Sequence, residues 1–226
     1  MFRYLAALTP NHTLCWDCAT GNGQAATALT EYFNRVVATD ASEAQIEAAV
    51  PDSNVEFAVA TAESSGLRAS SVDLLTVGQA FHWFDEQAFF AEAKRVLKTD
   101  GVLAIWCYGI CAVDPVCDAI IDKLYRDIIG DYWPPERDLI EQGYAGVTLP
   151  GEPVSTPPFD MSLGWQVDDM LGYLRTWSAC KRYEEAQGSD PVAQVEAALV
   201  DAWGPGMRDV VWPLTLKVSR ANSLLE

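Results

Sequence analysis

The sequence has few of the residues that build metal sites. Its 226 residues include two histidines, His12 and His82, and a single Cys-x-x-Cys pair, Cys15 and Cys18. A zinc site needs a second cysteine pair or nearby histidines, so no metal site is predicted. The six cysteines lie in apolar or helical stretches and are expected to be buried and reduced, as is typical of cytoplasmic proteins.

Positive charge is also scarce. Fifteen lysines and arginines stand against 32 acidic residues, which gives a formal net charge of −17. Such a field repels phosphate backbones and anionic membrane surfaces, so nucleic acid and membranes are disfavoured as partners and a small molecule is favoured. No apolar run reaches 18 residues, and the N-terminus lacks a signal-peptide pattern. We therefore expect a cytoplasmic protein, either a monomer or a homodimer.

The first half of the chain alternates between two hydrophobic periods. Short apolar runs predict strands at residues 13–17, 35–40, 55–60, 72–77 and 102–108, and helical patterns cover residues 23–33, 42–50 and 86–97. Strands that alternate with helices are typical of a parallel sheet with helices on both faces. The sequence therefore predicts a doubly wound, Rossmann-like α/β fold.

The second half has a different pattern. Helices are expected at residues 115–129, 166–185 and 191–203, strands at 159–165 and 210–218, and a loop rich in proline and aromatic residues at 132–158. The late strands are expected to complete a seven-stranded, mostly parallel sheet with an antiparallel C-terminal edge strand. The helices and the loop are expected to form a small cap within the same compact domain.

A glycine-rich turn follows the first predicted strand. Residues 14–26 read LCWDCATGNGQAA, and glycines at such a turn let backbone N–H groups approach a polar ligand closely. Gly21-x-Gly23-x-x-Ala26 matches the dinucleotide pattern, and Asp40 ends the next strand, where an acid that binds ribose belongs. On its own, this motif is a weak signal.

Asp17 helps to choose between nucleotide ligands. It lies four positions before Gly21, where a carboxylate would repel the diphosphate of a dinucleotide. A cationic ligand without phosphate reverses that preference. S-adenosylmethionine carries an amino group and a sulfonium but no phosphate, and Asp40 can accept hydrogen bonds from both of its ribose hydroxyls.

At these residues the sequence resembles the class I S-adenosylmethionine-dependent methyltransferases, specifically the UbiE-like, methyltransferase type 11 group. The matching segments are WDCATGNG, VVATD, VDLLTVGQAFHWFD and RVLKTDGVLAIW, in the family's order over roughly residues 13 to 108. The resemblance implies a cofactor-binding methyltransferase core at residues 1–110, with the rest of the sheet and a substrate-facing cap at 111–226. It also implies S-adenosyl-L-methionine as the cofactor, bound by Asp17, Ala19, Gly21, Gly23, Asp40, Ala41, Thr61, Ala62 and Gln79.

Three features depart from the family pattern. Ala19 stands where the family usually has a glycine, which is tolerable if this residue has a negative φ. Thr61 stands where the family often has an aspartate, so its hydroxyl would be a weaker acceptor for the adenine amino group. The helix that many relatives fold over the cofactor is expected to be missing or truncated, because the first predicted strand begins so near the N-terminus.

The remaining candidates concern catalysis and the methyl acceptor. His82 follows the fourth predicted strand and is the histidine placed to take a proton from the acceptor near neutral pH. Trp133 and Arg175 are predicted to contact the acceptor from the cap. The alternatives are a packing role for His82, a core position for Trp133 and a solvated position for Arg175. For the whole chain, the alternatives are an inactive S-adenosylmethionine-binding protein and, less favoured, an NAD-type oxidoreductase.

Overall fold

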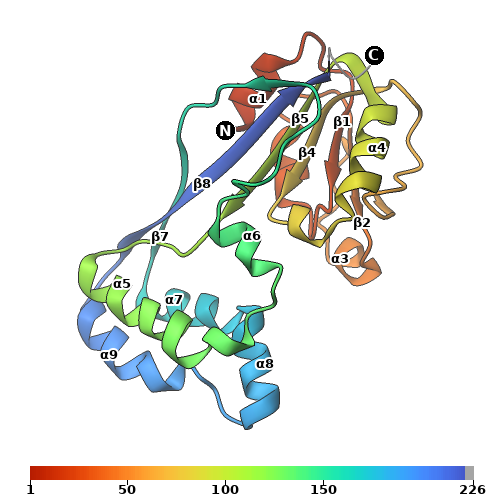
Figure 1. Ribbon diagram of the computed structural model, residues 1–226. Helices are drawn as coiled ribbons and strands as arrows, with labels where there is room; N and C mark the ends of the chain where they lie inside the picture. The colour runs from red at the N-terminus through yellow and green to blue at the C-terminus, as the bar shows by residue number, and fades with distance from the viewer. Residues whose placement is uncertain (222–226) are drawn as a thin grey trace. The chain divides into compact units, whose positions relative to one another are not determined.

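The computed structural model describes residues 1–221, which contain one eight-stranded sheet (Figure 1). Its order is β3-β2-β1-β4-β5-β8-β6, with β7 paired to β8. The strands are β1 (Cys15–Cys18), β2 (Val36–Asp40), β3 (Val55–Val59), β4 (Val72–Gly78), β5 (Leu97–Tyr108), β6 (Glu152–Val154), β7 (Phe159–Trp165) and β8 (Arg208–Arg220).

The chain divides into two compact units that alternate along the sequence. Unit 1 comprises residues 1–107, 142–159 and 215 onward, and unit 2 comprises residues 108–141 and 160–214. The sequence predicted one boundary near residue 110. The chain also passes from one unit to the other at three further points, so neither unit is a single continuous segment. In the described part of the chain, no helix is both long and apolar enough to cross a membrane.

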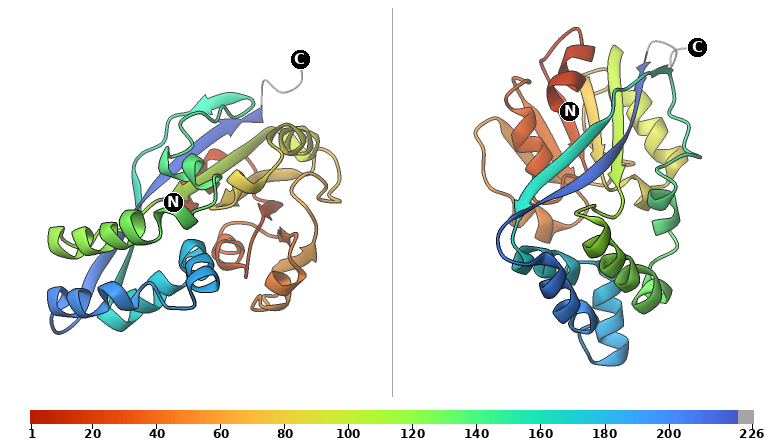
Figure 2. Two further views of the ribbon diagram at one scale, coloured as in Figure 1. Left: turned by 60° about the horizontal axis from the view of Figure 1, so that its bottom comes forward. Right: turned by 90° about the vertical axis from the view of Figure 1, so that its left-hand side faces the viewer.

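Unit 1 holds the parallel part of the sheet. Strands β1 to β5 pair in parallel, and β1 and β4 are buried along almost their whole length. The helices of this unit are α1 (Phe2–Leu8), α2 (Gln24–Leu29), α3 (Glu43–Glu47), η1 (Phe81–Trp83) and α4 (Glu86–Val96). Alternate strand residues, such as Cys15, Leu74 and Ala104, share one core with Leu5 of α1 and Leu29 of α2. Helix α4 lies on the opposite face of the sheet (Figure 2).

Helix α4 illustrates how local sequence defines these boundaries. The Asp85 side chain accepts a hydrogen bond from the Ala88 amide (3.0 Å) and caps the N-terminus. Lys94 and Arg95 lie in the last turn, where positive charge favours the helix dipole. Phe89, Ala93 and Val96 recur on one face and are buried.

Unit 2 is built mainly of helices around an aromatic core. They are α5 (Pro115–Asp122), the π-helical turn η2 (Lys123–Ile128), η3 (Gly130–Tyr132), α6 (Arg137–Glu141), α7 (Val167–Arg175), α8 (Ser178–Gln187) and α9 (Ala193–Trp203). Asp114 caps α5, with Pro115 at the first helical position. The buried core includes Ile121, Leu174, Trp203 and Trp212. Trp133 packs against it.

The predicted fold class is confirmed, with four differences in detail. The sheet has eight strands where seven were predicted, because β6 lies in the run expected to be a loop and pairs antiparallel with β8. The helix expected at 166–185 ends at Arg175 and resumes at Ser178, and short helices α1 and α6 were not predicted. The six cysteines are free and buried, as expected.

Candidate cofactor and acceptor sites

The carboxyl ends of four neighbouring strands meet at one edge of the sheet. Cys18 of β1 lies beside Thr39 of β2 and Val77 of β4, and Asp40 lies beside Val59 of β3. The loops that follow these strands therefore share that edge, where open α/β sheets bind ligands. The predicted cofactor residues lie here: Asp17, Ala19, Gly21, Gly23, Asp40, Ala41, Thr61, Ala62 and Gln79.

Three residues of the turn after β1 have a left-handed backbone conformation. Ala19, Gly21 and Gly23 have φ of 54°, 59° and 89°. The condition for an unstrained alanine, a negative φ, is therefore not met at Ala19, and this residue carries the strain that a glycine would avoid, about 1 to 2 kcal/mol. The Thr20 amide donates to the Thr39 carbonyl (2.9 Å), which fixes the turn to β2.

The two glycines of the turn are needed for different reasons. A Cβ on Gly23 would lie 2.7 Å from two ring carbons of Phe57, so this residue is enclosed by β3. A Cβ on Gly21 would meet nothing nearer than Gln45 Oε1 at 3.9 Å. Space for a close ligand is therefore left at Gly21, whereas Gly23 satisfies internal packing.

Asp40 joins the end of β2 to the glycine turn. Its Oδ2 accepts from the Gly21 amide and its Oδ1 from the Ser42 amide, both at 2.9 Å. A carboxylate has about four lone-pair sites, so acceptor capacity remains for a ligand diol. The carboxylate is thus held by backbone groups of two different loops.

Asp17 is buried beneath the turn. Its Oδ1 accepts from the Thr76 hydroxyl (2.7 Å) and its Oδ2 from the Thr20 hydroxyl (2.5 Å). Burial raises the pKa of Asp17 to about 6, against the opposing effect of hydrogen bonds from Thr20, Thr76 and the Ala26 backbone. No cationic side chain pairs with Asp17 within the described chain, so a cation at this edge would favour its ionised form.

The remaining candidate cofactor residues lie in the loops that follow β2, β3 and β4. Ala41 and Thr61 are exposed, whereas Ala62 is buried. Gln79 has a φ of 53°, and its amide donates to the Trp106 carbonyl (2.9 Å). Non-glycine residues held in this region cluster at functional sites, which supports a ligand contact at Gln79.

His82 is buried in the 3-10 turn η1. Its Nδ1 lies 3.1 Å from the Tyr144 hydroxyl, and its ring lies 4.8 Å from that of Trp83. Tyr144 has a φ of 54° and no exposed surface. Tyr144 was not predicted as a partner of His82, because it lies 62 residues further along the chain.

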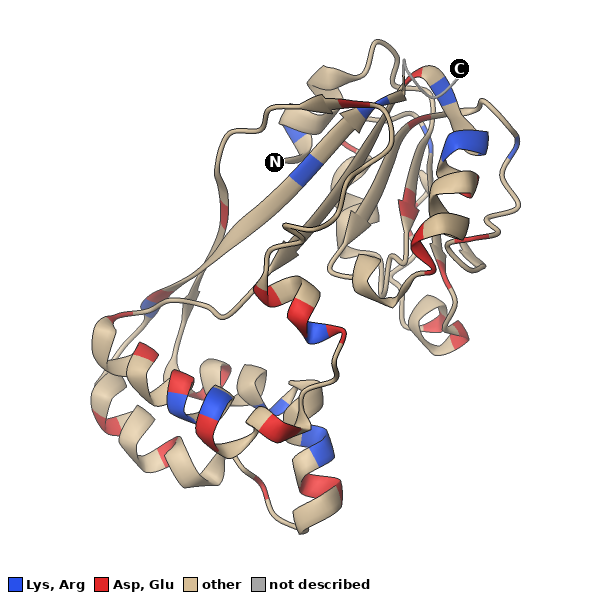
Figure 3. Ribbon diagram, viewed as in Figure 1, with Lys and Arg blue, Asp and Glu red and all other residues tan. Residues whose placement is uncertain are grey.

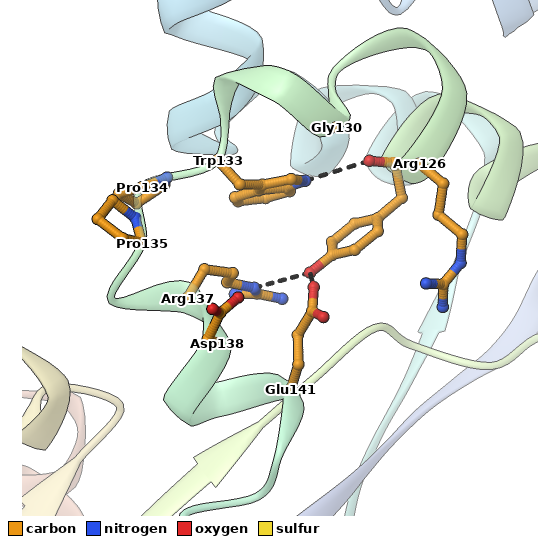
Figure 4. A pocket seen from close by; sticks show the side chains of 9 residues that line it. Arg126, Gly130, Trp133, Pro134, Pro135, Arg137, Asp138 and Glu141 are labelled. Carbon is orange, nitrogen blue, oxygen red and sulfur yellow. Dashed lines mark hydrogen bonds between the residues drawn. The ribbon is translucent and has the colours of Figure 1, made fainter.

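Unit 2 contains a pocket of about 280 Å³ (Figure 4). It is lined by Tyr125, Arg126, Gly130, Trp133, Pro134, Pro135, Arg137, Asp138 and Glu141. Trp133, a predicted acceptor residue, is part of this lining, and its ring lies 5.7 Å from that of Trp177. The sequence missed Tyr125 and Arg137, which carry no motif.

Arg175, the other predicted acceptor residue, is engaged elsewhere. Its Nε donates to Asp190 (2.8 Å) and its Nη2 to Glu196 (2.6 Å), and 41% of its side chain is exposed. It does not line the pocket described above. The structure therefore favours the solvated alternative for Arg175, and the arginines that line this pocket are Arg126 and Arg137.

Within residues 1–221, no group of three or more His, Cys, Asp or Glu side chains is placed to hold a metal ion. Burial raises the pKa of the Cys15 and Cys18 thiols well above their usual value, which disfavours the thiolate that a metal would need.

Comparison with known proteins identifies the family. The family model described as methyltransferase domain matches residues 16–105. A methyltransferase candidate of Dictyostelium discoideum is 35% identical over 193 residues, which are 84% of this chain and 73% of that protein. The solved structure of a type II methyltransferase candidate from Anaeromyxobacter dehalogenans is 40% identical, with a TM-score of 0.91 over 97% of this chain and 94% of that one. A methyltransferase candidate from Bacillus halodurans shares the fold, with a TM-score of 0.54 at 19% identity. The chain therefore belongs to the class I S-adenosylmethionine-dependent methyltransferases.

Proposed function

We propose that this protein transfers the methyl group of S-adenosylmethionine to a small-molecule acceptor. The observation that carries the proposal is the charge at the edge of the sheet in unit 1. The loops at residues 17–23, 40–42, 60–64 and 78–85 contain no lysine or arginine, but they contain Asp17, Asp40, Glu63 and Asp85. Such a site suits a ligand with cationic groups and no phosphate, and disfavours the diphosphate of NAD.

The proposed cofactor contacts follow from the geometry of the edge. Asp40, held by the Gly21 and Ser42 amides, accepts hydrogen bonds from the ribose diol. Asp17 supplies negative charge below the methionine end, and Gly21 admits the ligand to the backbone. Ala41, Thr61 and Ala62 border the adenine, with Gln79 at the methionine or acceptor side.

Methyl transfer places modest demands on the protein. The bound cofactor supplies a methyl carbon that the sulfonium activates for in-line displacement. The side chains of the chain then align the acceptor and exclude water. We propose that unit 1 binds the cofactor and that unit 2 binds the acceptor.

His82 is the proposed proton acceptor where the nucleophile is a hydroxyl or an acidic carbon. The Tyr144 hydroxyl at its Nδ1 orients the ring. We expect His82→Gln to lower kcat while leaving the affinity for S-adenosylhomocysteine within twofold. Tyr144→Phe should shift the pH profile of kcat without abolishing turnover. Unchanged turnover in His82→Gln would assign this histidine to packing.

The setting of the reaction is also proposed. The net charge of −17 disfavours nucleic acid as the acceptor, and the six free, buried cysteines suit a reducing cytoplasm. The protein acts as a monomer or a homodimer in this proposal. Methylation of RNA or DNA at a rate above that of small acceptors would contradict it.

Calorimetry tests the cofactor assignment directly. The protein should bind S-adenosylhomocysteine and show no heat with NAD; the reverse result would refute the proposal. Asp40→Asn should weaken binding by about 1.5 to 3 kcal/mol, the scale of charge-assisted hydrogen bonds. Glu47→Gln, an exposed change on α3, is the matched control and should leave the affinity unchanged.

A further inference from the structure

Arg137 lines the unit 2 pocket, where its guanidinium lies beside aromatic rings (Figure 4). Its guanidinium carbon is 4.7 Å from the centroid of the Trp133 ring and 5.5 Å from that of Tyr125. Its Nε donates to the Tyr125 hydroxyl (2.9 Å), which in turn donates to Glu141 Oε1 (2.5 Å). These contacts hold the guanidinium in one orientation.

The terminal nitrogens of Arg137 have no protein acceptor within residues 1–221, and no carboxylate lies within ion-pair distance of them. The other arginine of the pocket differs, because Arg126 pairs with Asp122 (2.6 Å). A guanidinium has five donors in a planar fork that fits a carboxylate. Arg137 is therefore oriented by the protein while its fork stays available.

The backbone under Tyr125 is irregular. Residues 123–128 form a π-helical turn, in which the Ile129 amide donates to the Leu124 carbonyl (3.0 Å). The Tyr125 carbonyl accepts from Trp133 Nε1 instead (3.2 Å). Such turns are frequent at functional sites, and this one sets two walls of the pocket.

We propose that unit 2 binds a carboxylate group of the methyl acceptor at the Arg137 fork, with Trp133 as an apolar wall. The proposal rests on the proposed function and names the acceptor class. A monoanion is favoured over a phosphate dianion because Asp138 and Glu141 also line the pocket and acidic residues are spread over the helices of this unit (Figure 3). The repulsion between these acidic residues and an anionic ligand grows with the negative charge of the ligand.

Tryptophan fluorescence tests the proposal, because Trp133 lines the pocket and the Trp177 ring packs against Trp133. Benzoate and hexanoate are titrated against their amides and against inorganic phosphate, with and without saturating S-adenosylhomocysteine. The wild type should bind one or both acids at least tenfold more tightly than the matching amide. Arg137→Gln should reduce that ratio to below about threefold, whereas the control Arg126→Gln should retain it.

A further variant keeps the test independent of folding defects. Arg137→Lys keeps the charge but loses the fork and should give an intermediate ratio. All variants should bind S-adenosylhomocysteine within twofold of the wild type.

Several results would overturn the proposal: no acid binds, the amides match the acids, phosphate binds more tightly than the acids, or Arg137→Gln keeps the preference. If the wild type does not bind S-adenosylhomocysteine, the proposed function is refuted instead. The two failures are distinguishable because acid binding is measured without methyl transfer.

Discussion

Replacing Asp17 by asparagine is expected to stabilise the ligand-free protein above neutral pH and to weaken its cofactor binding. Asparagine has the shape of a protonated aspartate, so the variant lacks the buried charge. Burial raises the pKa of Asp17 from 3.8 to about 6. The protonated form is thus favoured by folding, and the stability that this preference contributes is complete below pH 4 and lost as the pH rises past 6.

The size of the effect follows from the shift. A shift of about two pKa units contributes about 3 kcal/mol to the free energy of unfolding at low pH. About 1.4 kcal/mol of that contribution is lost between pH 5 and pH 8. Urea unfolding at those two pH values, above the isoelectric point near 4.3, should show the difference between wild type and variant changing by that amount. A difference that stays the same at both pH values would refute the reasoning.

Asp73 provides the matched control. It is also buried, but it pairs with Lys98 (2.7 Å) and accepts from the Leu14 amide (2.9 Å). Asp73→Asn should therefore lower stability at pH 8, by about 1.5 to 3 kcal/mol, whereas Asp17→Asn raises it. Equal signs for the two variants would contradict the assignment of Asp17 as an unpaired charge.

Cofactor affinity should follow the same titration. If the ammonium group of the ligand requires ionised Asp17, the wild type should bind S-adenosylhomocysteine about tenfold more tightly at pH 8 than at pH 5. The Asp17→Asn variant should bind weakly at both pH values. Calorimetry that finds equal pH dependence in both proteins would separate Asp17 from cofactor binding.

The remaining predictions concern the glycine turn. Gly23→Ala should destabilise the protein by about 2 to 3 kcal/mol in urea unfolding, because its Cβ would meet the Phe57 ring, and adding Phe57→Leu should recover part of the loss. Gly21→Ala should cost about 1 to 2 kcal/mol from its positive φ, with no such recovery, and should weaken S-adenosylhomocysteine binding. Ala19→Gly relieves the same strain but adds chain entropy to the unfolded state, so we expect a gain of up to about 1 kcal/mol; a loss of stability would contradict the strain at Ala19.

The gathering of the candidate cofactor residues at one edge of the sheet was predictable because its signals are local. Polar or glycine residues within three positions of a buried apolar run, as at Gly21, Asp40 and Gln79, mark the ends of parallel strands. The order of those runs then brings the ends together at one edge. The φ of Ala19 was not predictable in this way, because it depends on how the turn is fixed to Thr39 of the neighbouring strand.

The helical unit was predicted less well, because its decisive contacts are distant in sequence. Arg175 was predicted to contact the acceptor, but it pairs with Asp190 and Glu196, which lie 15 and 21 residues away in the sequence. The break between α7 and α8 has a local cause, since the Thr176 hydroxyl donates to the Tyr173 carbonyl (2.6 Å) and Trp177 is extended. The apolar periodicity on both sides of that break concealed it.

The burial of every cysteine has a practical consequence for spectroscopy. Each of the six thiols is enclosed, so reagents that alkylate surface thiols should leave the native protein unmodified. Cysteines introduced at exposed positions, such as Val50 in unit 1 and Val116 in unit 2, would then take a donor and an acceptor dye without removal of any native thiol. Energy transfer between those dyes would report the separation of the two units in solution, and its change when cofactor or acceptor is added.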